Sequence, residues 1–415
     1  MSETKRPQQT DYLNYAKNDS SINPAEERIR NKLINTIKFS PFWRRIYESF
    51  ASIALKAIGV FIPIKENRVL FMSFGGRRYD DSPRAIFEEM ISDPFFTSYD
   101  LYWAFIDPEP YKEMGIKAVR IDSIDYFTLA LSSKIWVTNT SVERGMRFKK
   151  HETVCINTWH GTPIKRMGEY KDKEPVEILT SQNDIDEEFL RKKFDVDRAT
   201  LLKVDLPRND CLVGYSEQDI NICKQRIGIP INKKVILYMP TYRDYLRDDN
   251  NLIYHVPQFN FEKWKNELGD DYIVLIRFHY LVNRLVTLPD DGLIINVTDY
   301  PTLTDLYLIS DIFISDYSSS FVDFSILGRP MYCYAYDIDE YERERGFSIN
   351  FREVMKDFIC ESEDELIRRI REIDWTCAEK RTAAFRKKYA NHAGNATKAV
   401  VTELKKQLDA KEWLG

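Results

Sequence analysis

The sequence lacks the features that mark several common classes of protein. Its six cysteines are scattered with no Cys-x-x-Cys pair, so neither a disulfide framework nor a zinc site is indicated, and we expect free thiols in a reducing cytosol. The first 40 residues are polar and charged, unlike a signal peptide. The net charge of −5 gives no basic excess, and we therefore expect no nucleic-acid partner.

A long apolar run is also missing near the N-terminus. Residues 50–62 form an apolar run with Lys56 as the only charge, but this stretch is shorter than the roughly 20 residues that a membrane-spanning helix needs. Basic and aromatic residues alternate around it: Lys38, Arg44, Arg45 and Lys56 beside Trp43, Phe50 and Phe61. Two interpretations remain open, a helix that lies in the membrane interface and a core helix packed on the first domain.

Histidine is scarce, with five in 415 residues, and one of them has an unusual position. His160 follows the apolar residues Val154 and Ile156 and begins a polar His-Gly-Thr-Pro turn. A strand that ends in such a turn places the imidazole at the rim of a sheet, where open α/β folds bind ligands. Since the ordinary pKa of histidine, about 6.5, suits proton transfer at neutral pH, His160 is a candidate catalytic residue.

From residue 65 onward, short apolar runs alternate with helical patterns. Strands are expected over 69–74, 101–106, 135–138 and 154–156, and then over 235–238, 273–276, 293–297, 312–314 and 331–334. Helices are expected near 83–91, 123–132, 183–194, 216–227, 301–309, 319–327, 363–373 and 378–409. This alternation predicts an α/β protein with two tandem Rossmann-like domains that face a cleft.

Turn-forming residues place the boundary between these domains. Pro207, Asn209 and Gly214 interrupt the pattern between the two series of strands. We therefore expect an N-terminal tail and helical extension over 1–64, a first domain over 65–210 and a second domain over 211–415.

Polar groups that suit phosphate follow three strands of the second domain. Arg243 and Arg277 each come after an apolar run, and a guanidinium there can hold phosphate oxygens in a bidentate fork. A salt bridge to a nearby carboxylate is the alternative for each. Ser318 and Ser319 precede a helix, where hydroxyls and backbone N–H groups face an anion or simply cap the helix.

Five segments resemble, in the same order, motifs of the CDP-glycerol glycerophosphotransferase family, the teichoic-acid primases and polymerases. They are residues 74–86 (FGGRRYDDSPRAI), 157–166 (NTWHGTPIKR), 237–244 (LYMPTYRD), 277–280 (RFHY) and 315–324 (SDYSSSFVDF). Residues 204–210 (VDLPRND) depart from the family pattern Gly-Tyr-Pro-Arg-Asn-Asp in lacking the glycine. The resemblance covers residues 65–355 and implies the GT-B architecture.

The resemblance also implies a reaction. An alditol phosphate, with glycerol phosphate as the first choice, would pass from a CDP-alditol donor to a hydroxyl of a lipid-linked or polymeric glycan acceptor, and CMP would leave. A CDP-ribitol enzyme and a GT-B sugar transferase are the alternatives. The reaction needs a base on one side and cationic or N–H groups on the other, and closure of the cleft is expected to assemble them.

The family motifs assign roles in catalysis and in donor binding. His160 is the expected base, and His279 is the second catalytic histidine, placed near the leaving group with Arg243 and Arg277. Ser318 and Ser319 are expected to contact the diphosphate. Asp323 is expected to bond the ribose, unless it is an exposed helical carboxylate.

The acceptor is expected on the first domain. Gly76 belongs to a Gly-Gly loop that would approach the acceptor, although most such pairs are simple turns. Arg77, Arg84 and Lys165 are expected near the acceptor phosphate, with a solvated basic edge as the alternative. No Asp-x-Asp motif stands in a strand-end loop, so no metal and no cofactor are expected. A lipid-linked acceptor would make the protein cytoplasmic and peripheral on the inner face of the cell membrane.

Overall fold

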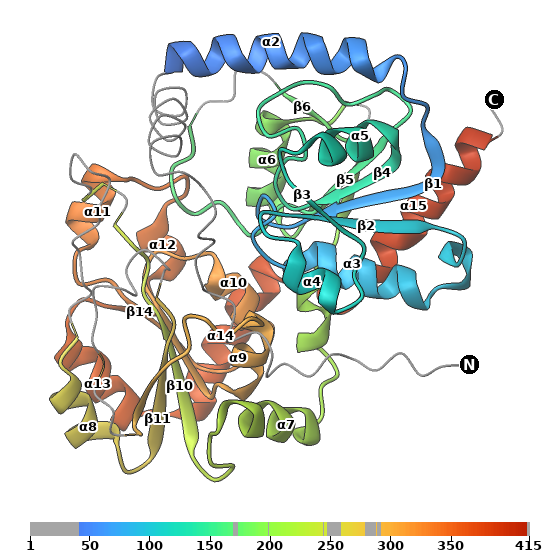
Figure 1. Ribbon diagram of the computed structural model, residues 1–415. Helices are drawn as coiled ribbons and strands as arrows, with labels where there is room; N and C mark the ends of the chain where they lie inside the picture. The colour runs from blue at the N-terminus through green and yellow to red at the C-terminus, as the bar shows by residue number, and fades with distance from the viewer. Residues whose placement is uncertain are drawn as a thin grey trace, which may run out of the picture.

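The computed structural model describes residues 41–168, 173–197, 199–243, 245–246, 259–278, 288 and 292–412. Two parallel sheets, each covered by helices, lie side by side (Figure 1). Loops from both halves line a common cleft. The predicted α/β class with two parallel sheets is therefore confirmed. All six cysteines are free thiols, as expected.

The first sheet has the strand order β3-β2-β1-β4-β5-β7-β9. Its strands are β1 (Lys65–Met72), β2 (Asp100–Phe105), β3 (Ala118–Arg120), β4 (Ser133–Thr138), β5 (Val154–Asn157), β7 (Ile178–Ser181) and β9 (Thr200–Lys203). Its helices are α3 (Asp81–Ser92), α4 (Glu109–Glu113), α5 (Ile124–Ser132) and α6 (Asp184–Lys193), with the 3-10 turn η2 (Pro94–Phe96) and a separate pair of short strands, β6 (Glu174–Pro175) and β8 (Phe194–Asp195). We did not predict β3, β7 and β9, which are short and carry weak apolar patterns.

The second sheet has the order β12-β11-β10-β13-β14-β15. Its strands are β10 (Lys234–Met239), β11 (Tyr272–Ile276), β12 (Ile294–Asn296), β13 (Ile312–Ser315), β14 (Met331–Tyr334) and β15 (Ile359–Cys360). The 3-10 turn η3 (Pro207–Leu212) joins the two halves and packs on α3 and α9. The helices of the second half are α7 (Glu217–Ile227), α8 (Phe261–Leu268), α9 (Leu303–Ile309), α10 (Ser320–Ser325), α11 (Ile338–Glu344), α12 (Phe351–Met355), α13 (Glu363–Arg371) and α14 (Trp375–Tyr389). Strand β11 is buried along its whole length, as both faces of a covered parallel sheet require.

The C-terminal helix returns to the first sheet. The single helix predicted near 378–409 is two helices, α14 and α15 (Ala396–Glu412). Helix α15 lies beside β1 (Figure 1). Val400 and Leu404 of α15 are buried in the same core as Val69 and Phe71 of β1. The predicted domain boundaries remain a prediction, but α15 packs on the first domain, whereas we had placed it with the second. Its apolar periodicity shows that one face is buried and does not show which sheet it meets.

Helix α2 (Pro41–Gly59) runs along the outside of the first domain (Figure 1). Ala51 and Leu55 are partly buried against the core cluster that includes α5. Its remaining large apolar side chains are exposed: Phe42, Trp43, Ile46, Tyr47, Phe50, Ile53 and Ile58. The core-helix interpretation therefore holds for one face only. Among the described helices, none combines the length and apolar character needed to cross a membrane.

Candidate active site

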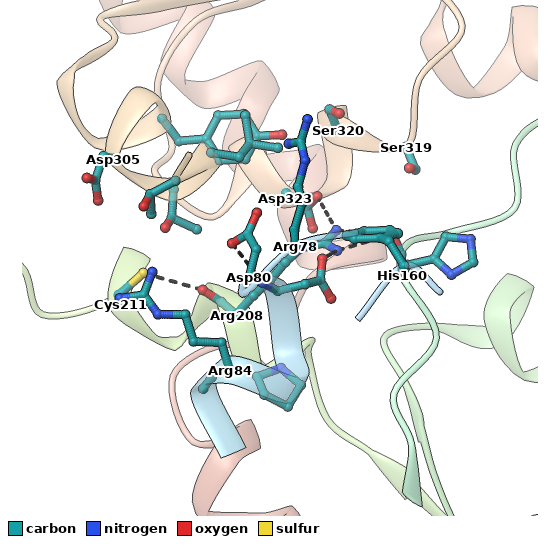
Figure 2. Close-up of a pocket in the computed structure, with 18 of the residues that line it drawn as sticks. Arg78, Asp80, Arg84, His160, Arg208, Cys211, Asp305, Ser319, Ser320 and Asp323 are labelled. Atoms are coloured by element: carbon teal, nitrogen blue, oxygen red, sulfur yellow. Dashed lines mark hydrogen bonds and ion pairs between the residues drawn. The ribbon is translucent and has the colours of Figure 1, made fainter. Parts of the chain in front are cut away.

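A cavity of about 1080 Å³ lies between the two sheets (Figure 2). It is lined by loops that follow strands of both domains, as expected where carboxyl ends of parallel strands face one another. Eight predicted site residues line it: Arg77, Arg84, His160, Lys165, Arg277, Ser318, Ser319 and Asp323. Gly76 and Arg243 are not among the lining residues, and His279 lies outside the described residues.

The His160 ring is oriented by a backbone carbonyl. Its Nδ1 lies 2.8 Å from the carbonyl oxygen of Asn139, the residue that follows β4. Because a carbonyl only accepts, Nδ1 carries the proton and Nε2 keeps a lone pair. Burial lowers the pKa of His160 below its usual value, so the neutral form persists at neutral pH. A neutral imidazole with an unprotonated Nε2 at a cavity wall can accept a proton from a bound hydroxyl.

The turn that carries His160 is fixed by side chains at the strand ends. Asn157, the last residue of β5, accepts from the Trp159 N–H at 2.9 Å and donates to the carbonyl of Thr140 at 2.6 Å. The Trp159 ring then packs 4.0 Å from the His160 ring, centroid to centroid. These contacts hold the imidazole in place before any ligand binds.

The chain after this turn is hydrogen-bonded to the second domain. Lys165 forms an antiparallel bridge with Phe347. On either side of it, the Arg166 N–H donates to the Gly346 carbonyl at 3.0 Å, and the Ser348 N–H donates to the Ile164 carbonyl at 2.9 Å. The segment that supplies the candidate base is thus part of both halves of the molecule.

Arg208, in η3, occupies the centre of the site, and we did not predict it. Its Nη1 lies 2.5 Å from Asp81 Oδ2, and its Nη2 lies 2.7 Å from Asp323 Oδ2. Both nitrogens also donate to the carbonyl of His160, at 3.2 and 3.3 Å. The sequence signal was the Pro-Arg-Asn-Asp segment, which we had interpreted only as a domain-joining loop.

The Asp323 carboxylate is bound by Arg208 and its neighbour Asn209. Its side chain is 2% exposed, its Oδ2 pairs with Arg208, and its Oδ1 accepts from Asn209 Nδ2 at 2.7 Å. The exposed-carboxylate alternative is therefore wrong. Both carboxylate oxygens have protein partners, so a ribose contact through Asp323 would have to share them.

The donor wall carries hydroxyls and a buried cation. Ser318 accepts from the Ser320 N–H at 3.2 Å, which is the local capping role, whereas Ser319 makes no side-chain capping bond to α10. Arg277 is 8% exposed and donates to the Tyr300 carbonyl at 2.7 Å. Within the described ranges it forms no ion pair with a carboxylate, and burial lowers its pKa to about 10, so it remains a cation at neutral pH.

Arg243 does not reach the cavity, which corrects our prediction of a phosphate contact. Its side chain is fully buried, with Nη1 2.8 Å from Asp316 Oδ2. The Nε and Nη2 atoms form a bidentate pair with Asp337 at 2.7 and 2.8 Å. The ion-pair alternative is thus confirmed, although with partners far away in the sequence. Asp244, the partner suggested by proximity, lies outside the described residues.

Gly76 also departs from its expected place. Its N–H donates to the Ser73 carbonyl, and its own carbonyl accepts from Ile106 at 2.7 Å. A β-carbon there would lie 2.8 Å from Ile121 Cγ2 and 3.2 Å from the Ala104 carbonyl. The glycine therefore allows the loop to pack on the end of β2 and does not approach the acceptor side of the cavity.

The basic residues of the first domain line the cavity as expected, but most have local partners. Arg77 donates to the Phe74 carbonyl at 3.0 Å, and Arg84 pairs with Glu88 at 2.8 Å. The Lys165 ammonium lies 5.6 Å from the centre of the Tyr242 ring. Arg78, which we did not predict, also lines the cavity (Figure 2). In the described part of the chain, no group of three His, Cys, Asp or Glu side chains is arranged to hold a metal ion.

Known proteins are similar to this chain in sequence. A teichoic acid glycerol-phosphate transferase of Staphylococcus aureus is 32% identical over 363 residues, which cover 81% of this chain and 92% of the relative. A teichoic acid poly(glycerol phosphate) polymerase of Staphylococcus epidermidis is 32% identical over 314 residues, which cover 70% of this chain but only 43% of the longer relative. A ribitol-phosphate primase of Bacillus spizizenii is 24% identical over 386 residues, covering 85% of this chain and 94% of that protein.

Solved structures agree with the fold. The wall teichoic acid polymerase TagF superimposes with a TM-score of 0.73 at 26% identity, covering 94% of this chain and 100% of the solved chain. A variant of the same polymerase soaked with CDPG gives a TM-score of 0.73 at 27% identity, with 95% and 100% coverage.

The model of one protein family covers most of the chain. The CDP-glycerol:poly(glycerophosphate) glycerophosphotransferase model matches residues 54–406, which include both sheets, the His160 turn and the Arg208 network. The expected GT-B-type arrangement and the expected family are both confirmed. This chain is a member of the CDP-glycerol:poly(glycerophosphate) glycerophosphotransferase family.

Proposed function

We propose that this chain transfers glycerol phosphate from CDP-glycerol to a hydroxyl of a lipid-linked or polymeric glycan acceptor and releases CMP. The observation that carries the proposal is the His160 imidazole, whose Nδ1 donates to Asn139 and whose Nε2 is left to accept a proton in the cavity. Family membership supplies the substrate class.

Residues on the two walls of the cavity have different roles in the reaction. The acceptor hydroxyl gives its proton to His160 Nε2 as its oxygen bonds to the β-phosphorus. The bond from that phosphorus to the oxygen bridging it to the α-phosphorus then breaks, and CMP leaves with the electron pair. Arg277 and the hydroxyls of Ser318 and Ser319 offset the negative charge that develops on the phosphate oxygens. The role of His279 beside the leaving group stays a prediction.

Glycerol is favoured over ribitol by the pattern of relatives. Those that act on glycerol phosphate by name are 27% to 32% identical to this chain. Those named for ribitol phosphate are 22% and 24% identical. The family match also disfavours the alternative of a sugar transferase, which would act at an anomeric carbon.

The acceptor enters from the side of the first domain. Arg77, Arg78, Arg84 and Lys165 line that wall, and four cationic side chains suit an acceptor that carries phosphate. Gly76 does not take part in acceptor binding, because it packs on the end of β2.

Helix α2 suits attachment to the cytoplasmic membrane surface, where a lipid-linked acceptor would lie. Its exposed aromatic and aliphatic side chains can enter the acyl boundary, and Arg44, Arg45 and Lys56 can meet anionic headgroups. We therefore place the protein in the cytoplasm, peripheral on the inner face of the membrane.

Release of CMP tests the donor directly. The purified chain is incubated with CDP-glycerol or CDP-ribitol and with a lipid-linked or poly(glycerol phosphate) primer, and CMP is quantified. We expect primer-dependent CMP release from CDP-glycerol at a rate at least about tenfold that from CDP-ribitol, the discrimination expected of about 1.4 kcal/mol. Faster release from CDP-ribitol would reassign the donor, and no release with either would contradict the proposed reaction.

A further inference from the structure

Arg208 joins three groups that belong to different parts of the site. Its guanidinium contacts Asp81 at the start of α3, Asp323 in α10 and the backbone carbonyl of His160. We propose that Arg208 is a positioning residue that holds the His160 turn in register with the donor side of the cavity. This inference rests on the proposed role of His160 as the base.

The geometry requires an arginine. One nitrogen of the guanidinium meets the carboxylate from the first domain, the other meets the carboxylate from the second, and both reach the His160 carbonyl. A planar fork with several fixed donors can bridge all three acceptors, whereas the single ammonium of a lysine cannot.

The Arg208 side chain is largely shielded from solvent and is supported by several contacts. Arg208 follows Pro207, its N–H lies 3.4 Å from Ser82 Oγ, and its side chain is 12% exposed. Asn209 binds Asp323 and Asp205 through the same Nδ2, at 2.7 and 3.1 Å. A displacement of this network would therefore be transmitted to the His160 backbone, and misplacing a catalytic group by about 1 Å costs on the order of 100-fold in rate.

The charges around the imidazole come from several elements. Asp81 from α3 favours the protonated ring, while Arg208 from η3 and Lys193 from α6 disfavour it. Asp323 from α10 is paired with Arg208. Removal of Asp81 should therefore lower the pKa of His160, and removal of Arg208 or Lys193 should raise it. A purely structural role of these residues would not produce such shifts.

Arg208→Lys tests positioning without a change of charge. The lysine keeps the positive charge, but it lacks the planar guanidinium that contacts all three acceptors. We expect kcat to fall about 10- to 100-fold, with the CDP-glycerol Kd within about threefold of wild type and the acid limb of the pH profile unmoved. Arg329→Lys is the matched control: Arg329 also donates to two carbonyls, those of Leu308 and Ser310, but outside the cavity. Its kcat should stay within about twofold of wild type.

Asp81→Asn provides a second test should Arg208→Lys fail to fold. It keeps the Arg208–Asp323 pair and removes the negative charge of Asp81, which favours protonated His160, so the acid limb of kcat should move to lower pH. An unmoved acid limb in Asp81→Asn, or a kcat of Arg208→Lys equal to that of Arg329→Lys, would overturn the inference. Full activity of His160→Ala would instead overturn the proposed base, so the two failures are distinguishable.

Discussion

Gly161 lies so close to Ser319 that a β-carbon on the glycine would be 2.7 Å from the serine Oγ. One residue follows the candidate base, and the other belongs to the donor wall. The two halves of the site therefore meet at this point, and closure of the cleft over a bound substrate stays a prediction. The glycine φ of +136° adds a second restriction, because side-chain-bearing residues rarely adopt it.

Gly161→Ala should damage transfer more than stability. The added methyl group must displace Ser319 or the His160 turn, and we expect kcat to fall about 100-fold, the usual cost of misplaced catalytic groups. Gly115→Ala is the matched control, since Gly115 also has a positive φ (+82°) but nothing lies within 4 Å of its β-position. If the two variants lose activity equally, the contact with Ser319 is not the cause.

Replacement of Arg243 should lower stability. Arg243→Met leaves the carboxylates of Asp316 and Asp337 without their buried cation, and breaking such a pair costs about 3–5 kcal/mol. Urea unfolding measures this loss. Arg352→Met is the control, because Arg352 pairs with Asp339 and Glu342 on the surface and should cost about 1 kcal/mol or less. A stable Arg243→Met protein that no longer binds CDP-glycerol would restore the original phosphate-contact prediction.

Buried carboxyl groups near the site should make stability fall as pH rises. Burial raises the pKa of Asp186 to about 7 and that of Asp205 to about 6, so the folded chain holds protons that the unfolded chain releases near pH 4. The stability that these two carboxyl groups contribute is fully present below about pH 4 and is lost as pH rises through 6 to 7. Asp186→Asn should therefore flatten the decline of Tm between pH 5.5 and 8.

An exposed carboxylate provides the control for that experiment. Asp219 completes the capping box of α7 with the N-cap Ser216, and its hydrogen bonds with Ser216 lower its pKa, so it is ionised across the whole window. Asp219→Asn should leave the slope of Tm against pH unchanged. If Asp186→Asn has the same slope as wild type, the Asp186 carboxyl is not the group that titrates.

Membrane attachment through α2 should depend on its charge. Arg44→Glu/Arg45→Glu removes two cations from α2, and at about 1 kcal/mol per basic residue the loss alone should weaken binding to anionic vesicles roughly 30-fold or more. Lys387→Glu/Lys388→Glu on α14 makes the same charge change elsewhere and should bind like wild type. Vesicle flotation at low salt measures both. Equal flotation of the two variants would exclude α2 as the membrane contact.

Long apolar strands and the loops after them could be predicted from the sequence. His160, Arg277 and Ser319 follow such strands, so a local pattern was enough to place them at the cavity. The edge strand β9 was missed because its four residues are only partly buried or exposed. Helix α15 was placed with the second domain because periodicity does not identify the packing partner.

The ion-pair networks could not be predicted in the same way. Arg208 is 127 residues from Asp81 and 115 from Asp323. Arg243 is 73 residues from Asp316 and 94 from Asp337. Only the fold brings these charges together, and an arginine in a strand-end loop has the same local signature whether it binds phosphate or buried carboxylates.

The most direct test of the account is His160→Ala, measured for both CMP release and CDP-glycerol affinity. Loss of a general base should lower kcat by about 10²–10⁴-fold while the donor Kd stays within about threefold of wild type. His151→Ala, an exposed histidine outside the cavity, should retain wild-type kcat. In the wild type, the acid limb of the pH profile should lie below the ordinary histidine value of about 6.5, because burial lowers the pKa of His160. A His160→Ala protein that releases CMP within about threefold of the wild-type rate would contradict the role of His160 as the general base.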